Sequence, residues 1–405
     1  MAHNSESIAM TRLLNWFRKP TSKFTAQTRL SLESLDHREL PSVASSASLI
    51  QSVTHTDSSA PTYVATLNNT LFFKADDGVH GRELWATDGT ACGTRLVKDI
   101  NKETDGSAID FHVVLNGVIY FNATNGKNGV ELWASDGTTA GTKLVKDIYE
   151  GVISSEPRYL GNIDGKLMLA ARSFGRGEAL WASDGTENGT KLVKNINPGN
   201  EGAAIKGWTV LNDKLYFTAN DGYRGRELWS TDGTAAGTDI VKDIKVGEEG
   251  SNARYLGKAG NEIVFAASKP GYGEELWATD GTTTHMLKDI NPGHDGSSIN
   301  YLTTSNGQVY ITAYDPDRGT EMWVTDGTKN GTHLVDDVNL GESSSAPKFL
   351  AKLNGVVFFT ANDGERGREL YRTDGTDEGT ALVKDINIGD AGSDAKFVAV
   401  VGNEI

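Results

Sequence analysis

Apolar positions recur along the chain in units of 48 residues, and each unit contains four short apolar stretches separated by turns rich in glycine and aspartate. In stretches such as 118–121, 215–217 and 356–359 the apolar residues stand at successive positions instead of alternating with polar ones. A sheet with one face in water would show alternation. We therefore predict sheets covered on both faces, each formed by four antiparallel strands.

The fourth unit illustrates the predicted strands, which are residues 208–211, 214–219, 226–231 and 239–244. Several units place Asn-Gly at the first turn, as at 116–117, and this dipeptide favours a two-residue hairpin because both turn positions need positive φ. The last stretch of each unit mixes charged residues into an apolar strand, as in 96–100. Such mixing is typical of an exposed outer edge that must not pair with another molecule.

The string Glu-Leu-Trp-x-x-Asp-Gly-Thr marks the third stretch of each unit. Its aromatic position is occupied by Trp85, Trp133, Trp181, Trp229, Trp277, Trp323 and Tyr371. The interval is 48 residues except between Trp277 and Trp323, where two residues are missing from one turn. Four-stranded units of about 40–50 residues are typical of propeller blades. The sequence therefore predicts an all-β fold, a β-propeller of seven four-stranded blades over residues 48–405.

The two ends of the repeat region leave a second arrangement open. Residues 48–53 have the pattern of a fourth strand, and residues 397–405 have that of a first strand with the start of a second. Together they resemble an eighth unit without its Glu-Leu-Trp strand. Eight blades with an incomplete or composite last blade are therefore the alternative, although the outer strand would then have no neighbour to pair with.

Residues 1–47 differ from the rest of the chain in charge. The first thirty residues carry five basic side chains and one acid, Glu6. Residues 29–42 resemble the LExLExRxLLS motif that precedes many large bacterial surface and secreted proteins, with departures at Asp36 and Pro41. We predict a basic leader followed by a flexible Ser/Ala-rich linker. Its role would be export by a non-standard N-terminal segment, and a leader without a sorting role is the alternative.

The longer string Glu-Leu-Trp-x-x-Asp-Gly-Thr-x-x-Gly-Thr-x-Leu-Val-Lys-Asp-Ile resembles the ELWxxDGT repeat family of bacterial proteins. The resemblance covers about residues 62–405, with local departures such as Glu178-Ala179 in the third unit and Asp336 in the sixth. It implies a hyalin-like secreted or cell-surface protein with no established enzymatic activity, and it supplies no catalytic residues. We accordingly expect an extracellular or cell-surface location on a bacterium, with a cytoplasmic location as the alternative.

Composition narrows the possible partners. The chain has 405 residues and a formal net charge of −15 at pH 7, which excludes nucleic acid as a partner because phosphate binding needs a basic surface. The single cysteine, Cys92, excludes an intrachain disulfide. No apolar run reaches the roughly 18 residues of a membrane-spanning helix. We expect a monomer with no transmembrane segment, no cofactor and no metal ion.

The repeated acidic residues invite a chemical interpretation. The turn aspartates are Asp88, Asp136, Asp184, Asp232, Asp280, Asp326 and Asp374, and the strand glutamates are Glu83, Glu131, Glu227, Glu275, Glu321 and Glu369. Each turn offers one carboxylate where calcium needs about six to eight oxygens, so we predict Asx-type turns. The glutamates are spread over the blades, whereas a catalytic carboxylate pair converges within about 5–10 Å. We predict that they bond backbone or a neighbouring cation, and that the chain is not an enzyme.

The residues that vary between units lie in the loops between the second and third strands. The candidate ligand-binding residues there are His80, Phe174, Arg176, Tyr223, Arg224, Tyr272 and Arg318. Aromatic and arginine side chains are the types that anchor binding sites. The sequence therefore predicts a non-enzymatic secreted or cell-surface protein that binds an unknown protein or glycan through this variable loop rim. A propeller-type hydrolase or lyase, and a purely structural envelope module, are the alternatives.

Overall fold

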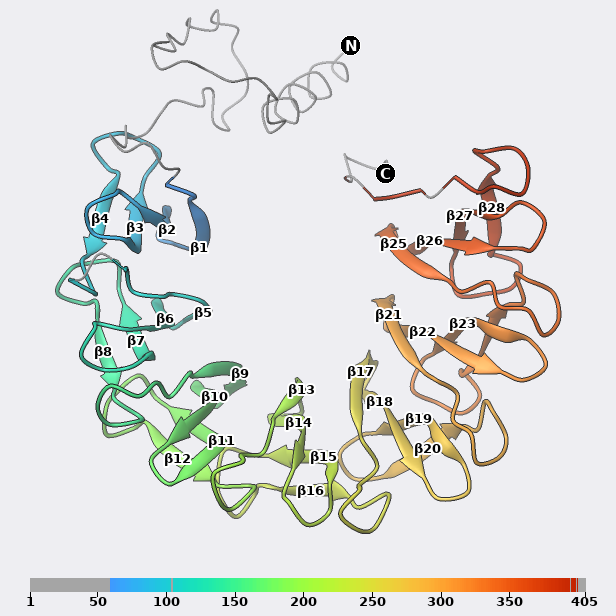
Figure 1. Cartoon of the computed structure of the whole chain (residues 1–405), viewed down its shortest axis with the longest axis horizontal. Helices are drawn as coiled ribbons and strands as arrows, with labels where there is room; N and C mark the ends of the chain where they lie inside the picture. The colour runs from blue at the N-terminus through green and yellow to red at the C-terminus, as the bar shows by residue number, and fades with distance from the viewer. Residues whose placement is uncertain (1–58, 103–104, 394, 398, 400–405) are drawn as a thin grey trace, which may run out of the picture. The chain divides into compact units, whose positions relative to one another are not determined.

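Seven separate antiparallel sheets follow one another along the chain, each built from four consecutive strands (Figure 1). The computed structural model describes residues 59–102, 105–393, 395–397 and 399. All regular structure in these residues is β, and the seven sheets are the blades of a β-propeller. The predicted fold class is therefore confirmed.

The strands of the first three sheets have the following bounds. The first sheet contains β1 (Thr62–Leu67), β2 (Thr70–Asp76), β3 (Arg82–Thr87) and β4 (Arg95–Lys98). The second contains β5 (His112–Leu115), β6 (Val118–Ala123), β7 (Glu131–Ser135) and β8 (Lys143–Lys146). The third contains β9 (Arg158–Ile163), β10 (Lys166–Ser173), β11 (Arg176–Ser183) and β12 (Lys191–Lys194).

The remaining four sheets keep the same order. The fourth contains β13 (Lys206–Leu211), β14 (Lys214–Asn220), β15 (Arg226–Thr231) and β16 (Asp239–Lys242). The fifth contains β17 (Arg254–Ala259), β18 (Glu262–Lys269), β19 (Gly273–Thr279) and β20 (Thr284–Lys288). The sixth contains β21 (Asn300–Ser305), β22 (Gln308–Asp315), β23 (Gly319–Thr325) and β24 (His333–Asp336). The seventh contains β25 (Lys348–Leu353), β26 (Val356–Asn362), β27 (Arg368–Thr373) and β28 (Ala381–Lys384).

The strands predicted for the fourth unit agree with the structure to within two residues. The first strand begins at Lys206, two residues earlier than predicted, and the fourth ends at Lys242, two residues before the predicted end. The lack of alternation is also explained, because middle strands such as β7 are buried along their whole length. The fourth strands are more exposed, as expected for outer edges.

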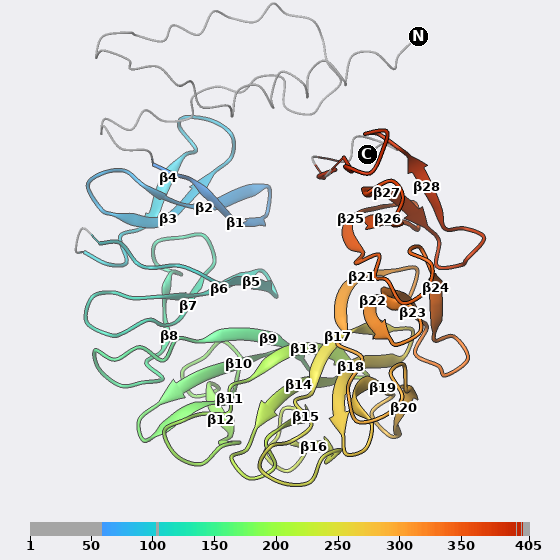
Figure 2. The same cartoon turned by 45° about the vertical axis from the view of Figure 1, so that its right-hand side comes forward.

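The sheets pack face to face through their apolar side chains. One buried cluster joins Leu84 of the first sheet to Phe121 and Trp133 of the second, and another joins Leu180 of the third to Trp229 of the fourth. The first strands of most neighbouring sheets also contact each other, as β13 does with β9 and β17 (Figure 2). The second to sixth sheets therefore each bury two faces against neighbouring sheets, and for this reason their middle strands have no polar face.

A lysine at the end of the fourth strand ties most sheets to the next one. Lys98 Nζ donates a hydrogen bond of 2.6 Å to the Thr142 carbonyl of the second sheet. Lys194 likewise donates to Thr238 and lies 5.9 Å from the ring centroid of Trp229. A cation over an aromatic face is attracted by the ring quadrupole. The repeated Lys and Trp thus form one contact between blades, which we call the Lys–Trp joint.

The Asp-Gly-Thr turns have the predicted Asx geometry. In the second sheet, Asp136 Oδ1 accepts hydrogen bonds from the backbone N–H of Thr138 at 2.8 Å and from its hydroxyl at 2.7 Å. The hydroxyl of Thr138 in turn accepts the Gly141 N–H. These bonds favour the ionised carboxylate, so the Thr138 hydroxyl, followed by its N–H, lowers the pKa of Asp136. The turn interpretation is confirmed.

The strand glutamates hold the loops that lead from one sheet to the next. All six are fully buried. Glu131 accepts the N–H of Ile148 at 2.8 Å and the N–H of Ser155 at 2.8 Å, and the Ser155 hydroxyl donates to it at 2.6 Å. Burial raises the pKa of Glu131 and Glu227, and it raises the pKa to about 7 for Glu83, Glu275 and Glu321. The prediction of a structural, backbone-bonding role is confirmed.

The seven sheets lie in one compact unit, Ile50–Phe397. The predicted half-strand at 48–53 and nearly all of the one at 397–405 lie outside the described residues, as does the leader at 1–47. The eight-bladed alternative and the boundary of the leader therefore stay predictions.

We expect the substitution Glu131→Ala to lower the free energy of unfolding by about 2–4 kcal/mol, because it leaves two buried N–H groups and one hydroxyl without an acceptor. Glu131→Gln keeps one acceptor oxygen and should lose less. Urea unfolding of both variants measures this, and an unchanged stability of the alanine variant would contradict the role given to the carboxylate.

Candidate functional site

The seven residues predicted to bind a ligand lie at the tips of five different hairpins. His80 lies between β2 and β3, Phe174 and Arg176 at the β10–β11 tip, Tyr223 and Arg224 between β14 and β15, Tyr272 between β18 and β19, and Arg318 between β22 and β23. Among these residues, the structure brings Phe174 and Arg176 together in one groove. The other five lie at the tips of four further hairpins.

Three of the predicted residues are held by an acid of their own loop. His80 Nδ1 lies 2.7 Å from Asp77, Arg318 lies 2.8 Å from Asp315, and in both cases the acid is three residues earlier. Such a contact restrains the loop and pairs the side chain with an acid, so the side chain is not available to a ligand. The side-chain hydrogen bond to Asp77 raises the pKa of His80 above its ordinary value.

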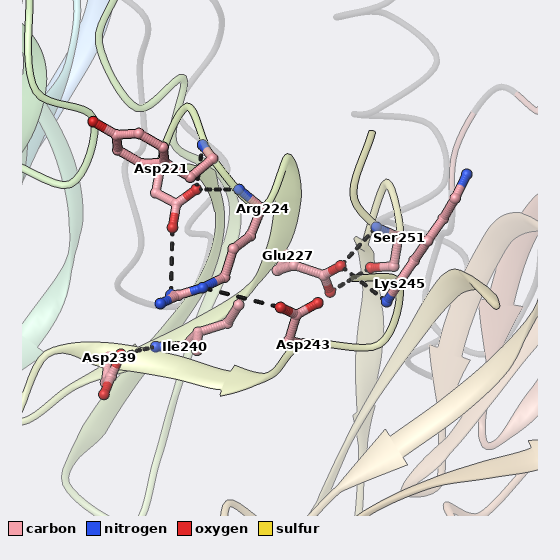
Figure 3. A network of polar contacts seen from close by, with 9 residues as sticks. Asp221, Arg224, Glu227, Asp239, Ile240, Asp243, Lys245 and Ser251 are labelled. Carbon is pink, nitrogen blue, oxygen red and sulfur yellow. Dashed lines mark hydrogen bonds and ion pairs between the residues drawn. The ribbon is translucent and has the colours of Figure 1, made fainter. Parts of the chain in front are cut away.

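The third of these residues, Arg224, belongs to a larger network in the fourth sheet. Figure 3 shows its guanidinium between Asp221, at 3.4 Å, and Asp243, at 4.0 Å. Glu227 lies beside this network and accepts the Ser251 N–H at 2.6 Å and the Ser251 hydroxyl at 2.5 Å. Arg224 thus holds its own loop through contacts with two acids. This structural role accounts for the residue, and no ligand is needed to explain it.

The two remaining aromatic residues differ in exposure and contacts. The Tyr272 ring lies 4.4 Å from Lys269 Nζ, within its own hairpin. Tyr223 is 69% exposed. Neither residue lines the groove of the third sheet.

The candidate site is the groove at the end of the third sheet, with a volume of about 730 Å³. Its lining includes residues of the β10–β11 tip between Arg172 and Glu178. Tyr149 and Ile153, from the loop that precedes β9, also line it, as does Glu201 in the loop that follows β12. Clefts of this size are typical of small-ligand sites.

The hairpin of the third sheet departs from those of the other sheets. Its strands β10 and β11 run for eight residues each and are joined by only Phe174 and Gly175. Gly175 has φ +68°, a conformation that suits glycine in a tight turn. The tip leaves the Phe174 ring 79% exposed. Exposing a large ring costs hydrophobic free energy, so a folding role does not explain this residue.

The third sheet also lacks the buried glutamate and its serine partner. Ala179 occupies the position of Glu131, and Ala203 that of Ser155, and both alanines are fully buried. Replacing both partners of a hydrogen bond by apolar groups is nearly neutral for stability. The preceding residue, Glu178, is half-buried, pairs with Arg158 at 2.5 Å and accepts the Ile205 N–H at 2.6 Å. Glu274 of the fifth sheet makes the same contacts with Arg254 and the Ile299 N–H. The loop at the groove is therefore held in a way that differs from the second sheet.

Two arginines give the groove a positive side. Arg172 pairs with Glu156 at 3.6 Å, but both side chains are more than half exposed, so the pair is weak. Arg176 has no described acidic side chain within ion-pair distance. Its guanidinium can take a carboxylate by two parallel hydrogen bonds. The groove lining also includes Glu178 and Glu201, so Arg176 is one unpaired cation in a lining whose formal charges balance.

Sequence reasoning found Phe174 and Arg176 but missed Arg172, Tyr149 and Ile153. The signal was present in the Glu178-Ala179 departure, which marks the one unit whose buried glutamate is replaced by alanine. Tyr149 and Ile153 were missed because they lie in a loop between sheets. Only the fold brings the loops before β9 and after β12 to the β10–β11 tip.

Two further features concern metals and membranes. In the described part of the chain, no three His, Cys, Asp or Glu side chains are grouped so that they could hold a metal ion. A search of the same residues for a helix with the length and apolar character to cross a bilayer gives none.

Comparisons with known proteins give similarity in fold. No protein-family model and no curated protein sequence matches the chain. Prolyl oligopeptidase B from Galerina marginata is 11% identical with a TM-score of 0.42, and the match covers 82% of this chain and 51% of that protein. A puromycin-hydrolyzing peptidase of Mycobacterium tuberculosis is 10% identical with a TM-score of 0.39, covering 81% and 53%. The chain thus spans about half the length of the solved proteins that it matches.

The function predicted from the sequence is contradicted. Four of the solved proteins similar to this chain are named as peptidases or a puromycin hydrolase. The loop contacts give a physical reason why the rim was misjudged, because His80, Arg224 and Arg318 pair with acids of their own loops. A non-enzymatic surface protein that binds protein or glycan through the whole variable rim is therefore a wrong prediction.

We expect Phe174→Ala to change the free energy of unfolding by no more than about 0.5 kcal/mol, because the ring is mostly exposed. The matched variant Phe217→Ala, at a fully buried ring of the fourth sheet, should lose about 3–5 kcal/mol. Thermal and urea unfolding of the two variants compares them. A loss at Phe174 similar to that at Phe217 would mean that Phe174 supports the fold.

Proposed function

We propose that this chain binds a short acidic peptide in the groove of its third sheet. The observation that carries the proposal is the coincidence of three departures at one place: the tight β10–β11 tip, the exposed Phe174, and the Ala179–Ala203 replacement. In a repeat protein the equivalent positions of the units can be compared with one another. Residues that all units share at a position serve the fold. Positions that depart together, at an exposed cavity, are explained by a ligand.

The ligand class follows from the groove's chemistry. Arg176 is an exposed cation without a described acidic partner, and Arg172 is only weakly paired. Guanidinium groups favour carboxylates over neutral groups. Phe174 and Ile153, the latter 54% exposed, offer an apolar surface beside these charges. A peptide with carboxylates on either side of an apolar residue satisfies both features at once.

The proposal differs from the rim prediction in site and in ligand. It concerns one groove on one sheet, formed by one hairpin and two loops, and it assigns no role to the other hairpin tips. It makes no statement about catalysis. The absence of enzymatic activity, the ELWxxDGT family, the surface location and the monomeric state stay predictions from the sequence.

Fluorescence anisotropy with labelled heptapeptides tests the proposal. The probes are Gly-Ser-Asp-Phe-Asp-Ser-Gly and its counterpart with lysine in place of aspartate. We expect the acidic peptide to bind and the basic one not to bind. Arg176→Ala and Phe174→Ala should each weaken binding by about tenfold or more, the loss typical of residues that anchor an interface.

Tyr223→Ala is the matched control, since Tyr223 is an exposed aromatic at the tip of the next sheet's hairpin. Its substitution should leave the affinity unchanged. If neither peptide binds, or both bind alike, the ligand class is wrong. If Tyr223→Ala weakens binding as much as Phe174→Ala, the groove is not the site.

A further inference from the structure

Neighbouring sheets contact each other through two kinds of apolar face. The trailing face of a sheet packs on the next sheet and includes the positions of Val97 and Ile100 in the first sheet. The leading face packs on the preceding sheet and includes the positions of Ile119 and Phe121 in the second sheet. Six such contacts join the seven sheets in order. The trailing face of the seventh sheet and the leading face of the first are the two faces that these contacts do not use.

The trailing face of the seventh sheet is exposed. Val383 and Ile386 occupy there the positions of Val97 and Ile100. Val383 is 44% exposed and Ile386 is 53% exposed, whereas Val97 is 1% exposed and Ile100 is 5% exposed. Apolar side chains that lie in water lose the hydrophobic free energy that the same residues gain in the other sheets.

The leading face of the first sheet is exposed as well. Leu71 is 39% exposed, and the next residue on this face, Phe73, is half-buried. The residues at the position of Leu71 in the other six sheets are all fully buried, namely Ile119, Leu167, Leu215, Ile263, Val309 and Val357. The first and seventh sheets thus expose the two kinds of face that pack together in every internal contact.

The turn glycines indicate that the two exposed faces are complementary in shape. Gly137 of the second sheet lies under the Phe72 ring of the first, since a Cβ added to the glycine would be 2.7 Å from Phe72 Cζ. The same glycine of each later sheet is covered by a residue of the sheet before it, Gly185 by Tyr120, Gly233 by Met168, Gly281 by Tyr216, Gly327 by Glu262 and Gly375 by Tyr310. No described residue covers Gly89 of the first sheet, and Phe358 of the seventh, at the position of Phe72, is half-buried. Among the described residues, the first sheet thus has the glycine without a ring over it, and the seventh has the ring without a glycine under it.

The Lys–Trp joint also has one half at each end. Lys384 is exposed at the end of β28, at the position of Lys98, which donates to the Thr142 carbonyl of the next sheet. In the first sheet, Thr94 occupies the position of Thr142, and Trp85 is the aromatic residue of the repeat. Lys384 and the Thr94 carbonyl are therefore a donor and an acceptor that would meet if the two exposed faces packed together.

We propose that the trailing face of the seventh sheet docks on the leading face of the first sheet of a second copy of this chain, so that copies associate head to tail. Both faces are exposed within one chain, so the chain's own first sheet does not cover its seventh. The contact between copies would repeat the contact between consecutive sheets, with Phe358 over Gly89 and Lys384 on Thr94. Because two different surfaces meet, the contact is heterologous, and further copies can add at either end.

This inference departs from the monomer expected from the sequence. It is independent of the peptide groove, because the groove lies on the third sheet and both docking faces lie on the first and seventh. Loss of peptide binding would leave the association of copies untouched, and the reverse also holds.

One residue of the seventh sheet's trailing face differs from those of the internal contacts. Arg372 is exposed at the position of Ala86, which is 1% exposed in the first sheet. The long side chain hinders close packing, although its guanidinium can still reach water at the edge of the contact. The contact between copies is therefore weaker than the internal ones. We expect Arg372→Ala, which introduces the residue of the first sheet, to lower the dissociation constant by about tenfold.

Sedimentation equilibrium of the full chain at about 1–100 µM, the range of weak associations, tests the proposal. We expect the average mass to rise with concentration. Ile386→Glu and Leu71→Glu each place a charge in one of the two faces, so each should raise the dissociation constant by about a hundredfold or more. A mixture of these two variants should form a dimer and nothing larger, because each variant keeps one intact face.

Val246→Glu is the matched control, since Val246 is 86% exposed in the loop after β16, and its substitution should leave the association unchanged. A wild-type chain that stays monomeric throughout would overturn the proposal, whether its own first sheet or another segment of the chain covers the faces. So would a mixture of Ile386→Glu and Leu71→Glu that stays monomeric. If Leu71→Glu fails to fold, Ile386→Glu and Arg372→Ala must shift the association in opposite directions, and equal association of these two variants would refute head-to-tail docking.

Discussion

The fold depends on a buried carboxylate that bonds to backbone. In six sheets a fully buried glutamate of the third strand accepts N–H groups from the loop that follows the fourth strand. Burying such a group is costly unless it is fully hydrogen-bonded, so the loop must adopt one conformation to satisfy it. That conformation sets where the next sheet begins, and the apolar faces and the Lys–Trp joints can then pack in the same way at each step.

Because this constraint repeats, departures from it are informative. The third sheet removes the Glu and the Ser partner together, as Ala179 and Ala203, and forms a groove beside them. The sixth sheet keeps Glu321 but reverses the charge of its joint through Asp336. In the third sheet the fold is satisfied by other contacts, which leaves the altered residues available for the proposed ligand. The recurring residues hold the frame.

Much of the frame could be predicted from the sequence. The spacing of Trp85 to Tyr371 gives the number of sheets, since each unit can bury its faces only against a neighbour, and the Asp-Gly-Thr turns have the geometry that short polar side chains impose. Strand ends such as Lys206 and Lys242 differed from the predicted ends by two residues. The closure of the propeller concerns residues at both ends that the structure does not describe.

The site was harder to predict for two physical reasons. Tyr149, Arg172 and Glu201 come from separate segments, and only the packing of loops onto the β10–β11 hairpin joins them. Exposed Arg and His residues in variable loops looked equivalent in sequence, yet Arg318 and His80 are tied to acids three residues away while Arg176 has no such partner. A residue type alone does not distinguish a charge used by the fold from one available to a ligand.

The account's central claim is that the residues departing from the repeat in the third sheet form a ligand site. The most direct measurement is a hydrogen-exchange footprint of the chain with and without saturating Gly-Ser-Asp-Phe-Asp-Ser-Gly. The account predicts new protection confined to residues 149–154, 172–178 and 200–204. Protection spread over the hairpin tips of several sheets, or absent from the β10–β11 tip, would contradict it.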